Sequence, residues 1–181
     1  VTRDDLPDGG ASVFHKTVQA IRRENPGCRI EVLIPDFMGN ATALQQVIDA
    51  APDVINHNIE VVEELFPIIR PQGGYQRSLQ VLKSIKTNAG DIPIKAGFMV
   101  GLGEGTEQIH TTLHDLRTAG VDFLTIGQYL QPTRNHAMIH KYYTPDEFFE
   151  LKTTALQMGF SHVESGPLVR SSYHAQNAFL R

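Results

Sequence analysis

Apolar positions along the chain follow two alternating periodicities. Segment 11–24 places Val13, Thr17 and Ile21 on one face at helical spacing, and the Asn-Pro-Gly turn that follows ends the helix. Segment 30–34 (IEVLI) is short and mostly β-branched, which is typical of a strand. The same alternation continues along the chain. It predicts helices over 11–24, 41–51, 75–88, 106–119 and 145–158, and strands over 30–34, 53–56, 94–100 and 123–126.

This alternation of short strands with helices predicts an α/β fold. Parallel strands joined by right-handed crossovers form a barrel or a doubly wound sheet, and both bind ligands at the carboxyl ends of the strands. The predicted strands end in polar clusters at Asp36, 56–60 (NHNIE), 101–104 (GLGE) and 127–132 (GQYLQP), which we expect to form one site. Asp36 alone also suits the cap of the following turn. No linker divides residues 1–181, so the sequence predicts a single domain.

The composition is ordinary for a soluble globular protein. The chain has 181 residues, of which 41% are hydrophobic and 20% charged, and no apolar run approaches the length of a transmembrane helix. A net charge of -4 with scattered basic residues argues against a nucleic-acid partner. The one cysteine, Cys28, cannot form an internal disulfide. The first residues resemble neither a signal nor a transit peptide, and we expect the sequence to begin within a larger protein.

Two of the polar clusters carry groups suited to a small polar ligand. Residues 97–104 (GFMVGLGE) end a strand with three glycines, which let the backbone approach a ligand closely. They are not a dinucleotide fingerprint, because Thr106 stands where its last glycine would be. Residues 56–60 offer two amides, an imidazole and a carboxylate, although an Asn/His pair can equally satisfy loop backbone. Arg70 and Lys95 are cations near strand ends that could meet a carboxylate.

The tail 166–175 (GPLVRSSYHA) gathers an arginine, two hydroxyls, a phenol and an imidazole within five positions. A polar terminal loop could have this composition, and so could one corner of a binding site. His136, His140 and His174 lack the spacing of a zinc site, and Ser171 lacks the glycine-flanked elbow of a serine hydrolase.

Taken together, seven segments resemble the lipoyl synthases, a family within the radical S-adenosylmethionine (SAM) superfamily. They occur in the family's order and cover nearly the whole chain, which makes the set far more specific than any one segment. The segments are VTRDDLPDGGA (1–11), IEVLIPDFMG (30–39), NHNIE (56–60), IRPQGGY (69–75), KAGFMVGLGE (95–104), LTIGQYLQPTRNH (124–136) and SGPLVRSSYHA (165–175).

The resemblance implies a partial (β/α) barrel of radical SAM type, with outer helices and with N-terminal strand(s) missing. SAM would be cleaved at a [4Fe-4S] cluster to a 5′-deoxyadenosyl radical, which would abstract hydrogen from C6 and C8 of a protein-bound octanoyl chain. A second, auxiliary [4Fe-4S] cluster would supply two sulfur atoms, so the enzyme would be a sulfurtransferase that makes the lipoyl cofactor. The implied partners are an octanoylated lipoyl carrier domain or H-protein and an electron donor such as ferredoxin or flavodoxin. The implied location is the bacterial cytoplasm or an organelle.

The family's motifs also imply roles for single residues. Arg170 and Ser171 would be catalytic, with Ser171 as a ligand of the auxiliary cluster, although Ser172 stays open as that ligand. The tail from about residue 160 to 181 would form this cluster site. The residues implied to bind SAM are Asn58, Glu60, Arg70, Lys95, Met99, Gly101, Glu104, Gln128, Tyr129 and Gln131.

The chain departs from the family in its cysteines. The family holds its two clusters with two cysteine triplets that precede the VTRDD segment; neither is present here, and Cys28 fits neither pattern. We therefore expect a C-terminal fragment that is inactive alone and holds no stable cluster. The alternatives are a cluster-free homologue that binds SAM or a lipoyl domain, and an ordinary (β/α) enzyme with a phosphate loop at 101–105. Gly105 replaces a threonine common in the family, which leaves the start of the next helix in question.

Overall fold

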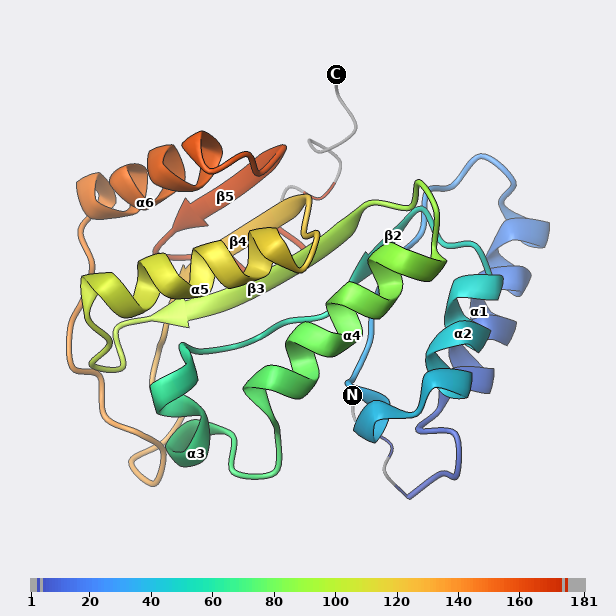
Figure 1. Ribbon diagram of the computed structural model, residues 1–181, viewed down its shortest axis with the longest axis horizontal. Coiled ribbons are helices and arrows are strands. Elements are labelled where there is room, and N and C mark those ends of the chain that lie inside the picture. The colour runs from blue at the N-terminus through green and yellow to red at the C-terminus, as the bar shows by residue number, and fades with distance from the viewer. Residues whose placement is uncertain (1–2, 4, 174, 176–181) are drawn as a thin grey trace.

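A sheet of five parallel strands runs through the chain, for which the computed structural model describes residues 3, 5–173 and 175. Each strand pairs with the next one in sequence, so the sheet order is the chain order (Figure 1). This topology confirms the expected succession of β/α units and forms an open arc rather than a closed barrel within the described residues. The strands are β1 (Glu31–Leu33), β2 (Val54–Asn56), β3 (Ile94–Val100), β4 (Phe123–Gln128) and β5 (His162–Gly166).

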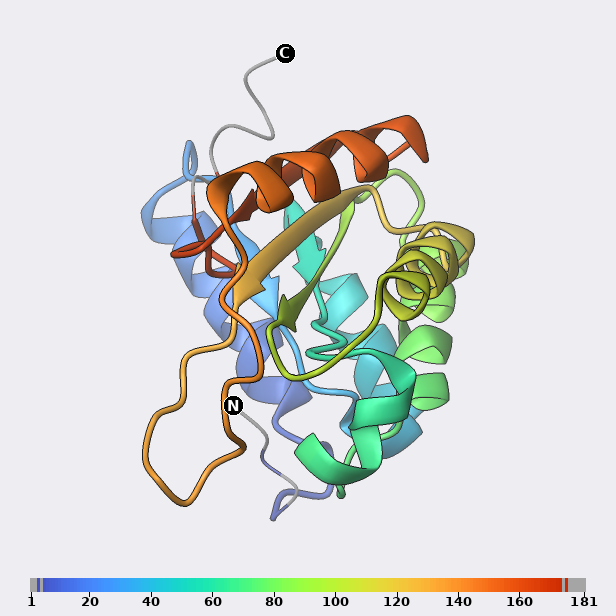
Figure 2. The same ribbon diagram turned by 90° about the vertical axis from the view of Figure 1, so that its left-hand side faces the viewer.

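The longer helices lie along the outer side of the curved sheet (Figure 2). Neighbouring helices pack against one another there, and the last helix, α6 (Pro145–Gln157), packs on β5. No helix in the described part of the chain is long and apolar enough to cross a membrane. The helices are α1 (Ala11–Glu24), α2 (Ala41–Asp49), α3 (Phe66–Ile69), α4 (Tyr75–Asn88), α5 (Thr106–Thr118) and α6 (Pro145–Gln157), with short 3-10 turns η1 (Phe37–Gly39) and η2 (Glu63–Leu65).

The two faces of the sheet differ in polarity. The inner face carries a charged cluster in which Lys95 Nζ lies 3.0 Å from Glu31 Oε1, and the Asn56 amide donates to the same carboxylate. A sheet with one apolar and one polar face matches a (β/α) arc whose interior binds a polar ligand. Apolar side chains on the outer face are buried in register as two rows, Val32–Ile55–Ile94 and Ala96–Leu124–Val163.

The sequence pattern misses β5 because much of this strand is polar. Val163 is buried in the core, whereas His162 and Glu164 are half-buried, with Nε2 and Oε1 3.1 Å apart. The strand pairs only with β4 among the described residues, so one of its edges has no neighbour in the sheet. A short edge strand with one apolar residue in register gives little periodic signal.

Helix α6 begins with the side-chain cap that the sequence predicts, whereas helix α5 begins at a glycine. In α6, Glu147 N–H donates to Thr144 Oγ1 and Thr144 N–H donates to Glu147 Oε2, which is the capping box that this spacing predicts. Helix α5 begins after Gly105, which has no side chain to cap it; instead Gln108 Oε1 accepts from Gly105 N–H. The helix therefore forms without the threonine that is common in the family at this position.

Candidate functional site

A cavity of about 120 Å³ opens at the inner face of the sheet. Asn58 and Glu60 enter it because the segment after β2 continues beside β3: Glu60 N–H donates to Gly97 O, and Met99 N–H donates to Glu60 O. The C-terminal tail covers the other side. The lining consists of Asn58, Glu60, Gly97, Phe98, Met99, Thr125, Gly127, Val169, Arg170 and Ser171.

At two positions in this lining, Gly97 and Gly127, there is no space for a side chain. A Cβ at Gly97 would overlap Thr125 Oγ1 and come within 3.2 Å of Asn58 Oδ1. A Cβ at Gly127 would stand 2.5 Å from the carbonyl oxygen of Val169. The first glycine lets Asn58 approach the backbone of β3, and the second lets the tail lie against β4. Both glycines therefore set the shape of the cavity.

Asn58 and Glu60 place two half-buried hydrogen-bond acceptors in the cavity. Asn58 Oδ1 is buried and has no hydrogen-bond partner in the described residues. Burial raises the pKa of the Glu60 carboxyl, against the opposing effects of the Arg70 charge and a hydrogen bond from Asn58. Glu60 also holds a left-handed backbone with φ of 69°. Such strain in a side chain other than glycine is kept where the surrounding structure fixes it, and it gathers at functional sites.

An adjoining cavity of about 130 Å³ shares Asn58 and Glu60 and adds His57 and Arg70. His57 Nδ1 lies 3.0 Å from the carbonyl oxygen of Ile34, so Nδ1 carries the proton and donates it. Burial lowers the pKa of His57, which keeps the ring neutral. Its Nε2 is then an acceptor, and it has no partner in the described part of the chain. Three acceptors, on His57, Asn58 and Glu60, thus surround a space that suits a ligand rich in O–H and N–H donors. Arg70 adds one cation to the same space.

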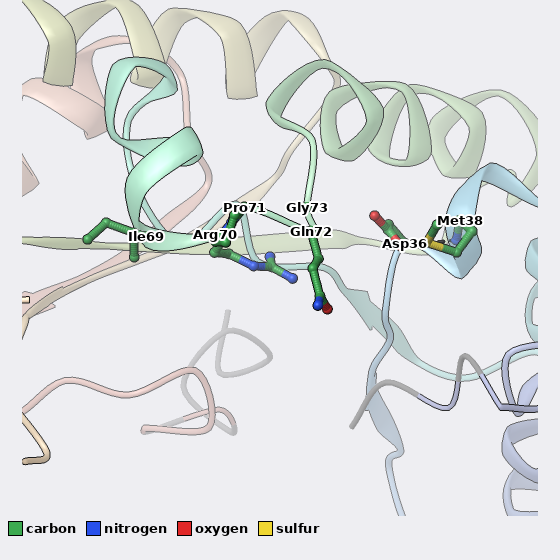
Figure 3. A pocket seen from close by; sticks show the side chains of 7 residues that line it. All are labelled: Asp36, Met38, Ile69, Arg70, Pro71, Gln72 and Gly73. Carbon is green, nitrogen blue, oxygen red and sulfur yellow. Dashed lines mark hydrogen bonds between the residues drawn. The ribbon is translucent and has the colours of Figure 1, made fainter. Parts of the chain in front are cut away.

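A third cavity of about 320 Å³ continues from Arg70 to the turn after β1. Figure 3 shows the Arg70 side chain extending from the end of α3 into the space on the side of Asp36 and Met38. Burial alone would raise the pKa of Asp36, but the Met38 N–H and the Arg77 guanidinium, 2.6 Å away, hold it below its usual value. Asp36 is therefore the anchored turn cap that its position predicts, and Arg70 is the cation that faces the cavities.

Curated proteins show close sequence similarity to this chain. It is 62% identical over 175 residues to a lipoyl synthase of Rubrobacter xylanophilus and 58% identical to that of Shouchella clausii, with 97% of the chain aligned in both cases. Nearly the whole chain is thus similar to curated lipoyl synthases. The match covers 54% and 57% of those two relatives, so the chain spans about half the length of the curated relatives it matches.

Two further comparisons add less. No family model matches the chain. A radical SAM methyltransferase, TsrM from Kitasatospora setae, solved with cobalamin and a [4Fe-4S] cluster bound, aligns over 66% of this chain and 24% of its own, with a TM-score of 0.49 and 12% identity. The similarity to lipoyl synthases is therefore carried by the curated sequences alone.

Several residues that the resemblance assigns to the lipoyl synthase site do meet in space. Asn58, Glu60, Met99, Arg170 and Ser171 come from three distant segments and line one cavity, and Arg70 faces the adjoining one. Gly101 and Glu104 form the turn that ends β3. The Glu104 carboxylate accepts from the N–H groups of Gly101 and Leu102, at 2.6 and 2.9 Å, so it closes that turn and lines none of the three cavities.

Four other assigned residues lie away from the cavities. Lys95 is 4% exposed and paired with Glu31, so it meets a carboxylate of the protein, at the amino end of β3. Gln128, Tyr129 and Gln131 donate to carbonyl oxygens of the loop between β4 and α6. None of these three residues lines any of the cavities described above. Gln128 follows Gly127, and successive strand residues point to opposite faces.

The sequence did not single out some residues that line the site. The sequence places His57 in a polar cluster, but it does not show that Nε2 lacks a hydrogen-bond partner in the described residues. Thr125, Gly127 and Val169 also line the main cavity. Gly127 lies opposite Met99 in the register of β3 and β4, which brings both into the cavity, and one sequence does not reveal this pairing.

Two residues of the C-terminal tail, Arg170 and Ser171, line the cavity. Ser171 lines the cavity, and the Arg170 guanidinium donates to Val169 O at 2.7 Å, whereas Ser172 is exposed. His174 and residues 176–181 lie outside the described residues, so the assigned role of the tail as a whole stays a prediction. Cys28 is exposed at the amino end of β1, the edge of the sheet opposite to the carboxyl ends.

Proposed function

We propose that this chain forms the SAM-binding cavity of a lipoyl synthase, which inserts two sulfur atoms at C6 and C8 of an octanoyl chain carried on a protein. The observation that carries the proposal is the meeting of Asn58, Glu60 and Ser171 in one glycine-lined cavity. The similarity to curated lipoyl synthases supports the same reaction. The partners would be an octanoylated carrier domain or H-protein and a small electron-transfer protein.

The polar groups of the cavities fit the polar end of SAM. Glu60 would accept from the α-ammonium group, and Arg70 would pair with the α-carboxylate. His57 Nε2 and Asn58 Oδ1, both buried and without a partner among the residues that the structure describes, would accept from ribose hydroxyls. Gly97 and Met99 would leave a flat, apolar surface for the adenine. The enclosed cavity would also keep hydrogen-atom donors and oxygen away from a carbon radical.

The iron–sulfur clusters fit this chain only in part. A cluster of either kind needs cysteine thiolates, and the one cysteine is exposed at the opposite edge of the sheet. The described residues include no group of three histidine, cysteine or acidic side chains placed to hold a metal. The chain would contribute the hydroxyl of Ser171 to the auxiliary cluster, with the thiolates supplied from elsewhere.

Calorimetric titration of the purified chain with SAM tests the proposal. Glu60→Gln removes the charge that would face the ammonium group, and a charged hydrogen bond contributes about 1.5–3 kcal/mol, so affinity should fall tenfold or more. Glu64→Gln makes the same chemical change at an exposed residue of η2 and should leave affinity unchanged. Absence of SAM binding, or an equal effect of both substitutions, would refute the proposed cavity.

A further inference from the structure

A long loop joins β4 to α6 at the carboxyl edge of the sheet. Loop 129–143 contains no helix or strand, and a connection of this length in a compact domain is uncommon unless it has a function. It leaves the end of β4 and returns across the end of β3, where Gly101 O accepts from His140 N–H at 2.8 Å. In Figure 2 the loop is the orange segment that projects beyond the strand ends. It therefore lies at the same edge of the sheet as the polar strand ends.

The loop is held in one conformation by side chains at its base. Gln128 Nε2 donates to Lys141 O, and Gln128 Oε1 accepts from Tyr143 N–H. The Tyr129 hydroxyl donates to Ala137 O at 2.9 Å, and Gln131 Nε2 donates to His136 O at 2.8 Å. Ordering a loop costs conformational entropy, and a surface ordered in advance binds a partner with less of that cost. These hydrogen bonds thus order the exposed surface of loop 129–143 before any partner binds.

The surface presented by the loop is apolar and basic. Met138 is 70% exposed and Tyr142 67% exposed, although side chains of this size are usually buried. The sequence has no acidic residue between Asp122 and Asp146, while Arg134 is exposed in the loop. Lys141 pairs with Glu147, and Arg134 has no ion-pair partner in the described part of the chain. Methionine, tyrosine and arginine are enriched in protein interfaces.

We propose that loop 129–143 docks the protein that carries the octanoyl chain, through an acidic surface of that carrier. The proposal rests on the proposed function, because an octanoylated carrier is a partner of this chain only if the chain takes part in that reaction. A substrate on a lysine must reach the cavity from the carboxyl edge, and this loop borders that edge. The basic loop would select an acidic carrier and speed its encounter with the enzyme. Met138 and Tyr142 would form the apolar contact.

The test compares two substrates in a protein that carries this chain together with both clusters. One substrate is the octanoylated carrier domain, and the other is octanoyl-lysine within a short neutral peptide. Arg134→Glu combined with Met138→Glu should raise KM for the domain about tenfold or more, because reversed charge repels the carrier and a buried apolar contact is lost. KM for the peptide and kcat for both substrates should stay unchanged. Lys83→Glu, on the exposed side of α4, is the matched charge control.

The outcomes separate the docking proposal from the proposed function. An unchanged KM for the carrier domain would overturn docking at the loop while leaving the reaction intact. An equal rise of KM for both substrates would show that the loop shapes the cavity or contacts another part of the enzyme, which also overturns the proposal. If the unaltered protein converts neither substrate, the proposed function fails and the docking proposal fails with it.

Discussion

Gly97→Ala places one methyl group at the most crowded point of the cavity. The new Cβ would overlap Thr125 Oγ1 and lie 3.2 Å from both Asn58 Oδ1 and the carbonyl oxygen of Thr125. The threonine side chain would have to leave its rotamer and its hydrogen bond to Ala96 O, and the backbone carbonyl of β4 is held in place by the sheet, since Gly97 and Thr125 are partners in register. The substitution should therefore force the two strands apart or displace Asn58 from the cavity.

Overpacking of this kind costs about 1–3 kcal/mol of unfolding free energy. With an m value of about 2 kcal/mol per M of urea, a loss of about 2 kcal/mol would lower the unfolding midpoint by about 1 M. Urea denaturation of the chain, followed by circular dichroism, measures this shift. SAM affinity should fall as well, because the methyl group occupies ligand space and moves Asn58.

A control and a second substitution make the reasoning refutable. Gly27→Ala adds the same methyl group where no atom lies within 4 Å, and it should leave the midpoint unchanged. In the background of Thr125→Ala, Gly97→Ala should cost clearly less, because the overlapping hydroxyl is gone. A midpoint for Gly97→Ala equal to that of the unaltered chain would refute the crowding argument, as would the same cost in both backgrounds.

Three further predictions concern single side chains. Lys95→Met leaves the Glu31 carboxylate without its cation and should reduce unfolding free energy by about 2–3 kcal/mol in urea denaturation, with SAM affinity unchanged; a loss of affinity at full stability would contradict this. Burial raises the pKa of Glu60, so SAM affinity measured by titration should fall as pH drops toward that raised value, and Glu60→Gln should remove the dependence. Ser171→Ala, in a protein with both clusters, should reduce sulfur insertion far more than SAM cleavage, measured as lipoyl product and 5′-deoxyadenosine; equal losses would exclude Ser171 as an auxiliary ligand.

Most of the fold could be predicted from periodicity. The bounds of α1 and α4 agree with the predicted 11–24 and 75–88, because both segments end at turn residues. The face predicted for α1 was wrong, since Val13 is 56% exposed and Val18 is buried in its place. Strand β3 agrees for a similar reason, since its residues are mostly apolar and buried. Strand β5 was missed because its inner face is polar, so that a single buried residue carried the signal.

The site was only partly predictable. The rule that ligands bind at the carboxyl ends of parallel strands correctly brought Asn58, Glu60 and Met99 together. It could not tell that the cavity begins at Gly97, so that Lys95, two residues earlier in β3, lies below it. Nor could it tell that Gln128 points away from the face of Gly127. Depth along a strand and the facing of its last residue depend on register, which one sequence does not reveal. The free Nε2 of His57 likewise depends on a tertiary hydrogen bond to Ile34 O.

The central claim is that the cavity between Asn58 and Ser171 binds SAM. An amide NMR titration of the isotope-labelled chain with SAM tests it at the level of single residues. The account predicts that the amides of Asn58, Gly97 and Gly127 shift with a common dissociation constant, while that of Cys28, at the other edge of the sheet, does not. Saturable shifts confined to other surfaces, or none at millimolar SAM, would contradict it.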